Sequence, residues 1–110
     1  MPTQQLTDFE LMVMLATARL GPDEAYAVSI AEDISERTGR TARRSAVHTT
    51  LQRLENKGLV RTRLGEARAE RGGKPRRLVS VEAEGVEAIR AATGAIQRML
   101  GGLDHLVGES

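Results

Sequence analysis

The sequence lacks cysteine and tryptophan and contains one phenylalanine and one tyrosine among its 110 residues. Without cysteine, neither a disulfide framework nor a thiolate metal site can form. His48 and His105 are the two histidines, and they lie too far apart in the sequence to show the spacing of metal ligands. We therefore expect no metal site and no other cofactor.

Long apolar stretches are missing as well. No run approaches the roughly 18 apolar residues that a membrane-spanning helix needs. The start MPTQQLTDFE also lacks the basic region and apolar segment that mark a signal peptide. A length of 110 residues suits one domain. We expect a cytoplasmic protein with a single domain, which a partner subunit would help to stabilise.

Charge is distributed very unevenly along the chain. Residues 1–40 contain three basic and seven acidic residues, residues 41–77 contain eleven basic and three acidic residues, and residues 78–110 contain two basic and five acidic residues. A basic block between two acidic ones suggests a polyanionic partner, with nucleic acid the first to consider. The alternative is a charged surface that only interacts with water.

Apolar residues at helical spacing predict three helices in the first half of the chain. Thr7 can cap the first of them, and Glu10 can complete a capping box. The second and third helices should span about 25–38 and 44–57, and each is followed by a glycine that can adopt the left-handed closing conformation. The third helix should bury the apolar residues Val47, Leu51 and Leu54.

From residue 59 onwards the apolar period changes from helical to two, which predicts paired strands over 59–63 and 76–81 around the loop GEARAERGGKP. A further helix should begin near residue 83. This order of elements predicts a mainly α fold with a two-stranded β wing, a winged helix-turn-helix. We expect it to occupy residues 1–81, followed by a C-terminal dimerisation helix and tail over 82–110.

The exposed face of the third predicted helix suits contact with DNA. In a winged helix-turn-helix this helix can enter the major groove while the hairpin lies over neighbouring phosphates. Hydroxyl and amide groups can bond to phosphates or base edges, and basic residues at the start of the helix lie near amides that attract anions. The candidate DNA-binding residues are Arg43, Arg44, Ser45, His48, Thr49, Gln52 and Arg53 on this helix, and Arg68, Arg71, Lys74 and Arg76 on the wing.

These candidates also have simpler interpretations. Gln52 can serve only to keep a surface helix soluble, and the wing cations can belong to a mobile, solvated loop. His48 can contact a base or a phosphate, or it can be a half-buried residue packed against the wing. The sequence gives no argument for catalysis by His48.

The last predicted helix carries an apolar stripe at heptad-like spacing. The residues of this stripe are Val86, Ile89, Ile96, Leu100 and Leu103. An apolar stripe on a helix that leaves the domain predicts a partner helix. Gly94 and the pair Gly101-Gly102 should keep the seam short, because glycine costs roughly 1 kcal/mol relative to alanine inside a helix.

The chain contains the segments LTDFELMVMLATARLGPDEAYAVSIAEDISERTGR, AVHTTLQRLENKGLVRTRLGE and ERGGKPRR, and a last helix with an acidic start and Gly85. Together these segments resemble the PadR family of bacterial transcriptional regulators across about residues 6–100. The most specific of them are TTLQRLENKGLV and ERGGKPRR, in this order and at this distance. The resemblance implies a winged-helix domain and a homodimer that binds a palindromic operator and usually represses transcription.

The resemblance also implies roles for individual residues. Carried over by position, DNA contacts fall on Ser45, His48, Thr49 and Arg53, and on the wing around residues 71–76. Dimer contacts fall on the first and last helices. The candidate dimer residues are Leu11, Leu15, Val86, Ile89, Ile96, Leu100 and Leu103.

The chain departs from the PadR pattern at three places. Family members usually have tyrosine at the position of His48, a cap-like serine near Arg43, and an aromatic pair at Leu78-Val79. The first two departures bear on which bases are read, and the third bears on packing under the wing.

Many relatives bind a small aromatic molecule at the dimer interface. Here Phe9 and Tyr26 are the only aromatic residues, so little is available for a flat stacking pocket, and a small-molecule effector stays an open question.

Two other functional classes compete with a DNA-binding regulator. The first is a winged-helix module whose basic hairpin binds an acidic protein. The small polar residues on the exposed face of the third helix argue against it, because protein interfaces favour aromatic or methionine anchors. The second is an enzyme, and the sequence shows neither a catalytic triad motif nor a phosphate-binding glycine loop.

Overall fold

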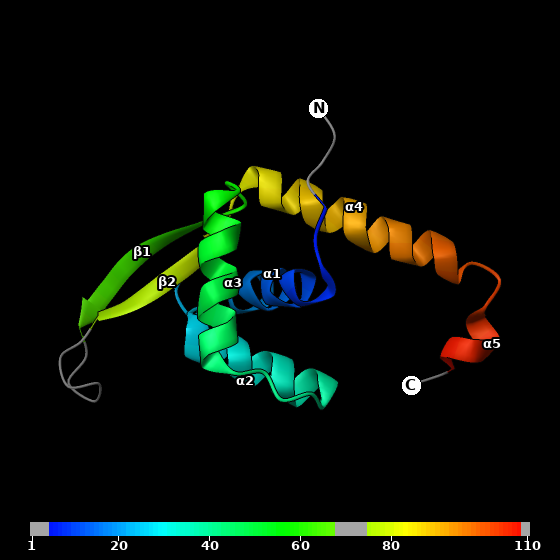
Figure 1. Ribbon diagram of the computed structural model, residues 1–110, viewed down its shortest axis with the longest axis horizontal. Helices are drawn as coiled ribbons and strands as arrows, with labels where there is room; N and C mark the ends of the chain where they lie inside the picture. Colours follow the sequence, from blue (N-terminus) through cyan, green and yellow to red (C-terminus); the bar gives the residue numbers. More distant parts are fainter. Residues whose placement is uncertain (1–4, 68–74, 109–110) are drawn as a thin grey trace.

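The computed structural model describes residues 5–67 and 75–108 and confirms a mainly helical fold with one antiparallel strand pair. The elements in chain order are α1 (Asp8–Leu20), α2 (Ala27–Thr38), α3 (Arg44–Asn56), β1 (Val60–Ala67), β2 (Pro75–Val81), α4 (Ala83–Leu100) and α5 (Asp104–Val107). Helices α1, α2 and α3 pack together, the two strands project to one side, and α4 extends to the other (Figure 1).

Helix α1 lies at the centre of the fold, with contacts to α2, α3, β2 and α4. The predicted capping box is confirmed: the Thr7 hydroxyl accepts a hydrogen bond from the Glu10 amide at 3.1 Å, and the Thr7 amide donates to Glu10 Oε1 at 2.9 Å. Val13, Met14 and Ala16 are buried. The helix therefore packs on more than one side.

Helix α2 begins two residues later than predicted, because Ala25 forms a backbone contact outside the helix. The Ala25 carbonyl accepts a hydrogen bond from the Val79 amide of β2 at 2.8 Å. Tyr26 then serves as the N-cap, and its amide donates to the Ser29 hydroxyl at 3.0 Å. At the other end, Gly39 has the predicted left-handed conformation with φ of 74°.

Helix α3 ends in a glycine motif, as predicted. Gly58 has φ of 80°. Its amide donates to the Glu55 carbonyl, and the Leu59 amide donates to the Leu54 carbonyl at 3.0 Å. This pair of bonds is a Schellman motif, which satisfies carbonyls at a helix end and turns the chain sharply. Helix α3 is therefore followed at once by β1.

The two strands are longer than predicted. They pair in antiparallel register from Val60 opposite Val81 to Leu64 opposite Arg77, and a bulge follows before Ala67 pairs with Pro75. Bulges bend a strand and increase its twist. We call the pair β1 and β2 the wing. Leu78 and Val79, which replace an aromatic pair of the PadR pattern, are buried at its base.

The first turns of α4 pack on the core, and the later turns leave it. The Glu82 amide donates to the Leu59 carbonyl at 2.9 Å, Gly85 is buried, and Ala88 belongs to the core. Among the residues that the structure describes, no helix combines the length and the apolar character needed to cross a membrane. The later part of α4 protrudes from the domain (Figure 1).

The predicted stripe of the last helix is too long by one residue. Helix α4 ends at Leu100, and Gly102, with φ of 83°, turns the chain. Leu103 then stands at the N-cap of the short helix α5. It therefore does not continue the face of α4, because the glycine pair interrupts the helix before it.

The core is aliphatic and is built from all the elements except α5. Its members are Val13, Met14, Ala16, Ala25, Ile30, Ala31, Ile34, Val47, Leu51, Leu54, Leu59, Val60, Val79 and Ala88. The apolar residues predicted for the buried face of α3 are all among them. Phe9 packs against the edge of this cluster.

Two glycines of α4 should respond oppositely to alanine. A Cβ at Gly85 would lie 2.2 Å from the Leu59 carbonyl oxygen, so we expect Gly85→Ala to separate α4 from the end of α3 and to lower the free energy of unfolding by roughly 2 kcal/mol or more. A Cβ at Gly94 would meet only Arg98 Nη1 at 3.4 Å. Gly94→Ala should therefore raise the free energy of unfolding by up to about 1 kcal/mol.

Urea unfolding followed by circular dichroism measures both changes, with the two variants serving as controls for each other. Equal stabilisation by the two alanines would contradict the close contact at Gly85.

Candidate nucleic-acid interface

The outer face of α3 is polar and exposed. Ser45, His48, Thr49 and Gln52 are all exposed. Within the part of the chain that the structure describes, none of these four side chains forms a hydrogen bond or an ion pair. Their donor and acceptor groups are therefore available to a ligand on this face. The opposite face holds Val47, Leu51 and Leu54 against the core.

The N-terminus of α3 carries two exposed arginines. Arg43 is the N-cap residue, with extended backbone and no hydrogen bond from its side chain to the helix, and Arg44 is the first residue of the helix. Neither guanidinium pairs with a carboxylate among the described residues. The free amides of a helix N-terminus attract anions. Two unpaired guanidiniums add to that attraction, so this end of α3 is suited to bind a phosphate.

Folding neutralises many of the other cations in the basic block of residues 41–77. Arg53 and Lys57 both approach Glu10, Arg61 lies 3.7 Å from Glu82, Arg63 lies 2.9 Å from Asp23, and Arg76 lies 4.0 Å from Glu24. The acidic flanks of the sequence thus supply partners for the basic block. Of the block's described cations, Arg43, Arg44 and Arg77 have no carboxylate partner. The positive charge available to a ligand is smaller than the sequence predicts.

The turn between α1 and α2 holds the wing in place. Arg63 of β1 donates to the Pro22 carbonyl at 3.1 Å and to Asp23 at 2.9 Å. The backbone bond from Val79 to Ala25 adds a contact to β2. Side-chain and backbone bonds therefore join this turn to both strands of the wing.

Arg76 lies against the body of the protein and not at the surface of the wing. Its side chain is only 10% exposed, its guanidinium lies 5.0 Å from the centre of the Tyr26 ring, and its Nε has no hydrogen-bond partner among the described residues. A guanidinium over an aromatic face is a favourable cation–π contact. The proposed DNA contact of Arg76 is thus limited to the small part of its side chain that remains exposed.

A small crevice separates α3 from the wing. It has a volume of about 120 Å³ and is bordered by His48 and Gln52 of α3 and by Thr62 and Arg77 of the strands. His48 is exposed at this crevice and is not half-buried. A polar chain spans the same gap: Arg77 donates to the Thr62 hydroxyl at 3.4 Å, and that hydroxyl donates to Glu55 at 2.9 Å.

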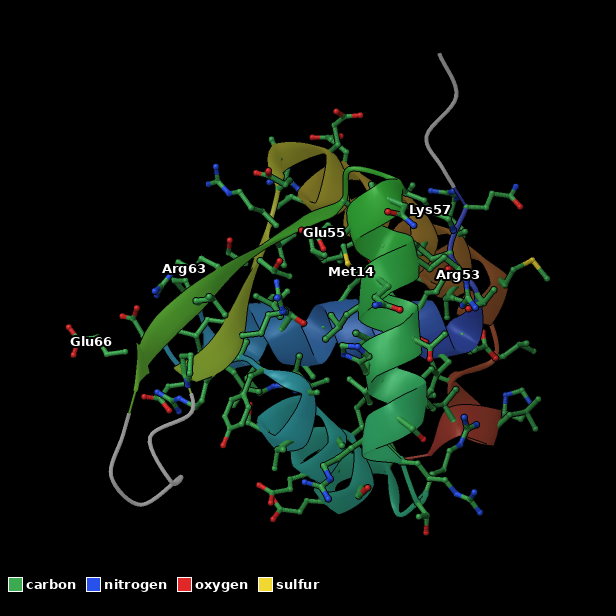
Figure 2. All side chains as sticks on the ribbon, turned by 60° about the vertical axis from the view of Figure 1, so that its left-hand side comes forward. Met14, Arg53, Glu55, Lys57, Arg63 and Glu66 are labelled. Carbon is green, nitrogen blue, oxygen red and sulfur yellow. The ribbon has the colours of Figure 1, made fainter. Side chains whose placement is uncertain are left out.

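Glu10 connects α1 to α3 through a buried charge. Its carboxylate is 1% exposed and lies 3.0 Å from Lys57 Nζ and 4.0 Å from Arg53 Nη1. Burial raises the pKa of Glu10, but the hydrogen bond from the Thr7 amide and the charges of Lys57 and Arg53 lower that pKa by more, so the net pKa lies below the ordinary value of 4.5. In Figure 2, Arg53 and Lys57 lie on one side of α3, and Glu55 lies on the side that faces the strands.

The candidate dimer residues differ in exposure. Ile96 is 53% exposed, Leu100 is 38% exposed and Val86 is 37% exposed. Ile89 is half-buried against the core. Leu11 is half-buried, and it lines a groove of about 360 Å³ between α1 and α4 together with alanines of α4. Leu15 is half-buried on α1 but borders a different hollow, next to α2.

Some of the sequence candidates lie outside the described residues, namely Arg68, Arg71 and Lys74 of the wing. Other residues were missed. Arg77, which has no carboxylate partner among the described residues, was not selected from the sequence. The alternation of side chains along the strand places Arg77 on the face opposite Arg76. The ion pairs of Glu10, Asp23 and Glu24 were missed because they join residues about 40 to 50 positions apart. No local sequence pattern reports such pairs.

The charge of Glu10 predicts a pH-dependent stability. Glu10→Gln keeps an acceptor for the Thr7 amide but loses the attraction to Lys57, so it should lower the free energy of unfolding at pH 7 by roughly 1–2 kcal/mol, allowing for the partial exposure of Lys57. Because the folded-state pKa of Glu10 is lowered, its stabilisation is present above pH 4.5 and is lost as the pH falls through the lower folded pKa.

The measurement is urea unfolding of both proteins at pH 7 and pH 3, where the difference between them should shrink. Glu32→Gln, at an exposed position of α2, is the matched control and should change the stability little. A difference that is the same at both pH values would show that the Glu10 charge does not stabilise the fold.

Comparison with known proteins finds similarity in structure. No protein-family model and no curated protein matches the sequence. A PadR-like transcriptional regulator from Bacillus cereus superposes with a TM-score of 0.72 at 12% identity, covering 93% of each chain. A PadR-like transcription factor from Bacteroides fragilis gives 0.71 at 18% identity, covering 89% of this chain and 88% of the other.

A PadR family regulator from Eggerthella lenta superposes with a TM-score of 0.67 at 21% identity, covering 90% of this chain and 83% of the other. The similarity extends over the wing and the last helix as well as the three-helix core, because it includes about nine tenths of the chain. The chain has the winged-helix fold of PadR-like transcriptional regulators, as the sequence resemblance predicted.

Proposed function

We propose that this protein is a DNA-binding transcriptional regulator of the PadR type, a repressor that binds a palindromic operator as a homodimer. Helix α3 enters the major groove, and the wing lies on the adjacent backbone. The observation that carries the proposal is the outer face of α3, where four exposed polar side chains follow an arginine pair, all of them without partners among the described residues. Such a face matches the groups that phosphates and base edges offer.

The residues of α3 divide into two roles. Arg43 and Arg44 at its N-terminus bind phosphate and position the helix, while His48 and Gln52 face the base edges. Gln52 can form the paired hydrogen bonds that an adenine edge accepts and donates. Arg77 of β2 adds a phosphate contact on the next stretch of backbone, on the far side of the crevice that His48 borders.

Several features of α4 support a homodimer. Its protruding part exposes Ile96 and Leu100, whose burial would remove apolar surface from water. The groove beside it is lined by small alanines, at positions 88, 91, 92 and 95, and by Leu11. Small residues let a second helix approach closely, so the α4 helix of a second copy fits this groove. Two copies related by a two-fold axis would present their α3 helices to half-sites about 34–36 Å apart, or a multiple of that distance.

The first test of this function is binding to DNA at two salt concentrations. The probe is the duplex immediately upstream of the protein's own coding sequence, and a scrambled duplex is the control. Six to ten phosphate contacts per dimer should reduce affinity about 10³- to 10⁵-fold between 50 and 200 mM salt. Arg44→Ala should weaken binding to both duplexes, whereas Gln52→Ala should weaken mainly the preference for the native duplex.

A salt-independent affinity would contradict the proposal. Binding to an acidic protein in place of DNA at low salt would favour the alternative, a winged-helix interaction module that uses its basic hairpin.

The second test concerns the dimer. Changing Ile96 and Leu100 together to lysine should give monomers in sedimentation velocity and weaken operator binding, because both side chains lie on the exposed stripe of α4. Ile89 is left unchanged, because it also packs against the core. Gln97→Lys, an exposed position on the same helix, is the matched control and should leave the dimer intact. An unchanged dimer in the double variant would place the interface elsewhere.

A further inference from the structure

Arg53 of α3 and Lys57 at its C-cap share a single buried carboxylate oxygen. Lys57 Nζ lies 3.0 Å from Glu10 Oε2, and Arg53 Nη1 lies 4.0 Å from the same atom. The other oxygen, Oε1, accepts the hydrogen bond from the Thr7 amide. Arg53 and Lys57 are four residues apart on a helix, so they lie on one face and can reach the same group.

The two cations are bound to Glu10 unequally. Lys57 donates a hydrogen bond to the carboxylate and is 29% exposed. Arg53 is 53% exposed, and its guanidinium donates no hydrogen bond to any described residue. The Arg53 guanidinium thus lies at the edge of the exposed face of α3, and the described residues use none of its donors.

A buried carboxylate needs at least one close cation, because leaving it unpaired is strongly destabilising. Lys57 meets that need in the present arrangement. Arg53 can then turn to a phosphate without leaving Glu10 unpaired. If Lys57 were absent, Arg53 would be the only cation among the described residues within reach of Glu10, and folding would hold it there.

From this geometry we infer that Lys57 is a positioning residue that, by neutralising Glu10, frees Arg53 for the DNA backbone. The inference rests on the proposed function. It assigns to the buried Glu10 and to Lys57, the C-cap residue of α3, control over a phosphate contact made by a third residue. The phosphate contact itself belongs to Arg53.

The test uses a fluorescein-labelled 30-base-pair duplex of arbitrary sequence, because phosphate contacts do not depend on sequence. The slope of log affinity against log salt is measured by anisotropy for the full chain. Arg53→Met should reduce this slope by about 0.9 for each copy of Arg53. Lys57→Met should reduce it by the same amount, and the double variant should show no further loss.

Removing the carboxylate should reverse the effect of Lys57→Met. In Glu10→Gln/Lys57→Met, no buried charge holds Arg53, so the slope and the affinity should return to the wild-type values. Direct contact between Lys57 and phosphate predicts the opposite result: the loss would persist in this variant and would add to that of Arg53→Met. Either of those two results would overturn the inference.

A matched control comes from Arg61, whose exposed side chain lies 3.7 Å from the partly exposed Glu82. Arg61→Met and Arg53→Met should act additively, because they share no partner.

If Lys57→Met does not fold, the salt slopes of Glu10→Gln and Glu10→Gln/Lys57→Met are compared with each other. Equal slopes support the inference, and a lower slope in the double variant overturns it. Wild-type protein that does not bind the duplex at 50 mM salt refutes the proposed function, and this role with it. A wild type that binds and is unaffected by Arg53→Met refutes only this role.

Discussion

The backbone of Leu59 is the point at which α3, the wing and α4 meet. Its amide closes the Schellman motif at the end of α3, its carbonyl accepts the hydrogen bond from Glu82 at the start of α4, and the residue itself leads directly into β1. Gly85 then packs against the same carbonyl. The orientation of α3, the wing and the protruding helix therefore depends on one short stretch of backbone, and hydrogen bonds in a packed interior hold such a stretch rigidly.

Electrostatic pairing adds a second layer of constraint. The acidic residues near the N-terminus fold back onto the basic block: Glu10 contacts the end of α3, while Asp23 and Glu24 contact the two strands of the wing. Exposed pairs of this kind contribute little to stability individually. Their main consequence is to select which described cations of the basic block have no carboxylate partner, namely Arg43 and Arg44 at the N-terminus of α3 and Arg77 on the wing.

The arrangement separates the surface proposed to bind DNA from the surface proposed to bind a second copy. The outer face of α3 and the wing lie on one part of the molecule, and the protruding end of α4 lies on another (Figure 1). A second copy could therefore bind along α4 without covering the outer face of α3. Because the first turns of α4 belong to the same core as α3, the position of a partner bound along α4 would fix the spacing between the two α3 helices.

The amino-acid sequence by itself determined the features that depend on neighbouring residues. The capping box of Thr7 and Glu10, the glycine that ends α3, the buried face of that helix and the pairing of the two strands all follow from local spacing, because helix caps, turns and periodicity involve residues only a few positions apart. Only the tertiary structure decided the start of α2, the burial of Arg76 and the pairing of the basic block. These depend on contacts between residues far apart in the chain, such as Ala25 with Val79 and Glu10 with Lys57, and local pattern cannot encode which distant groups folding brings together.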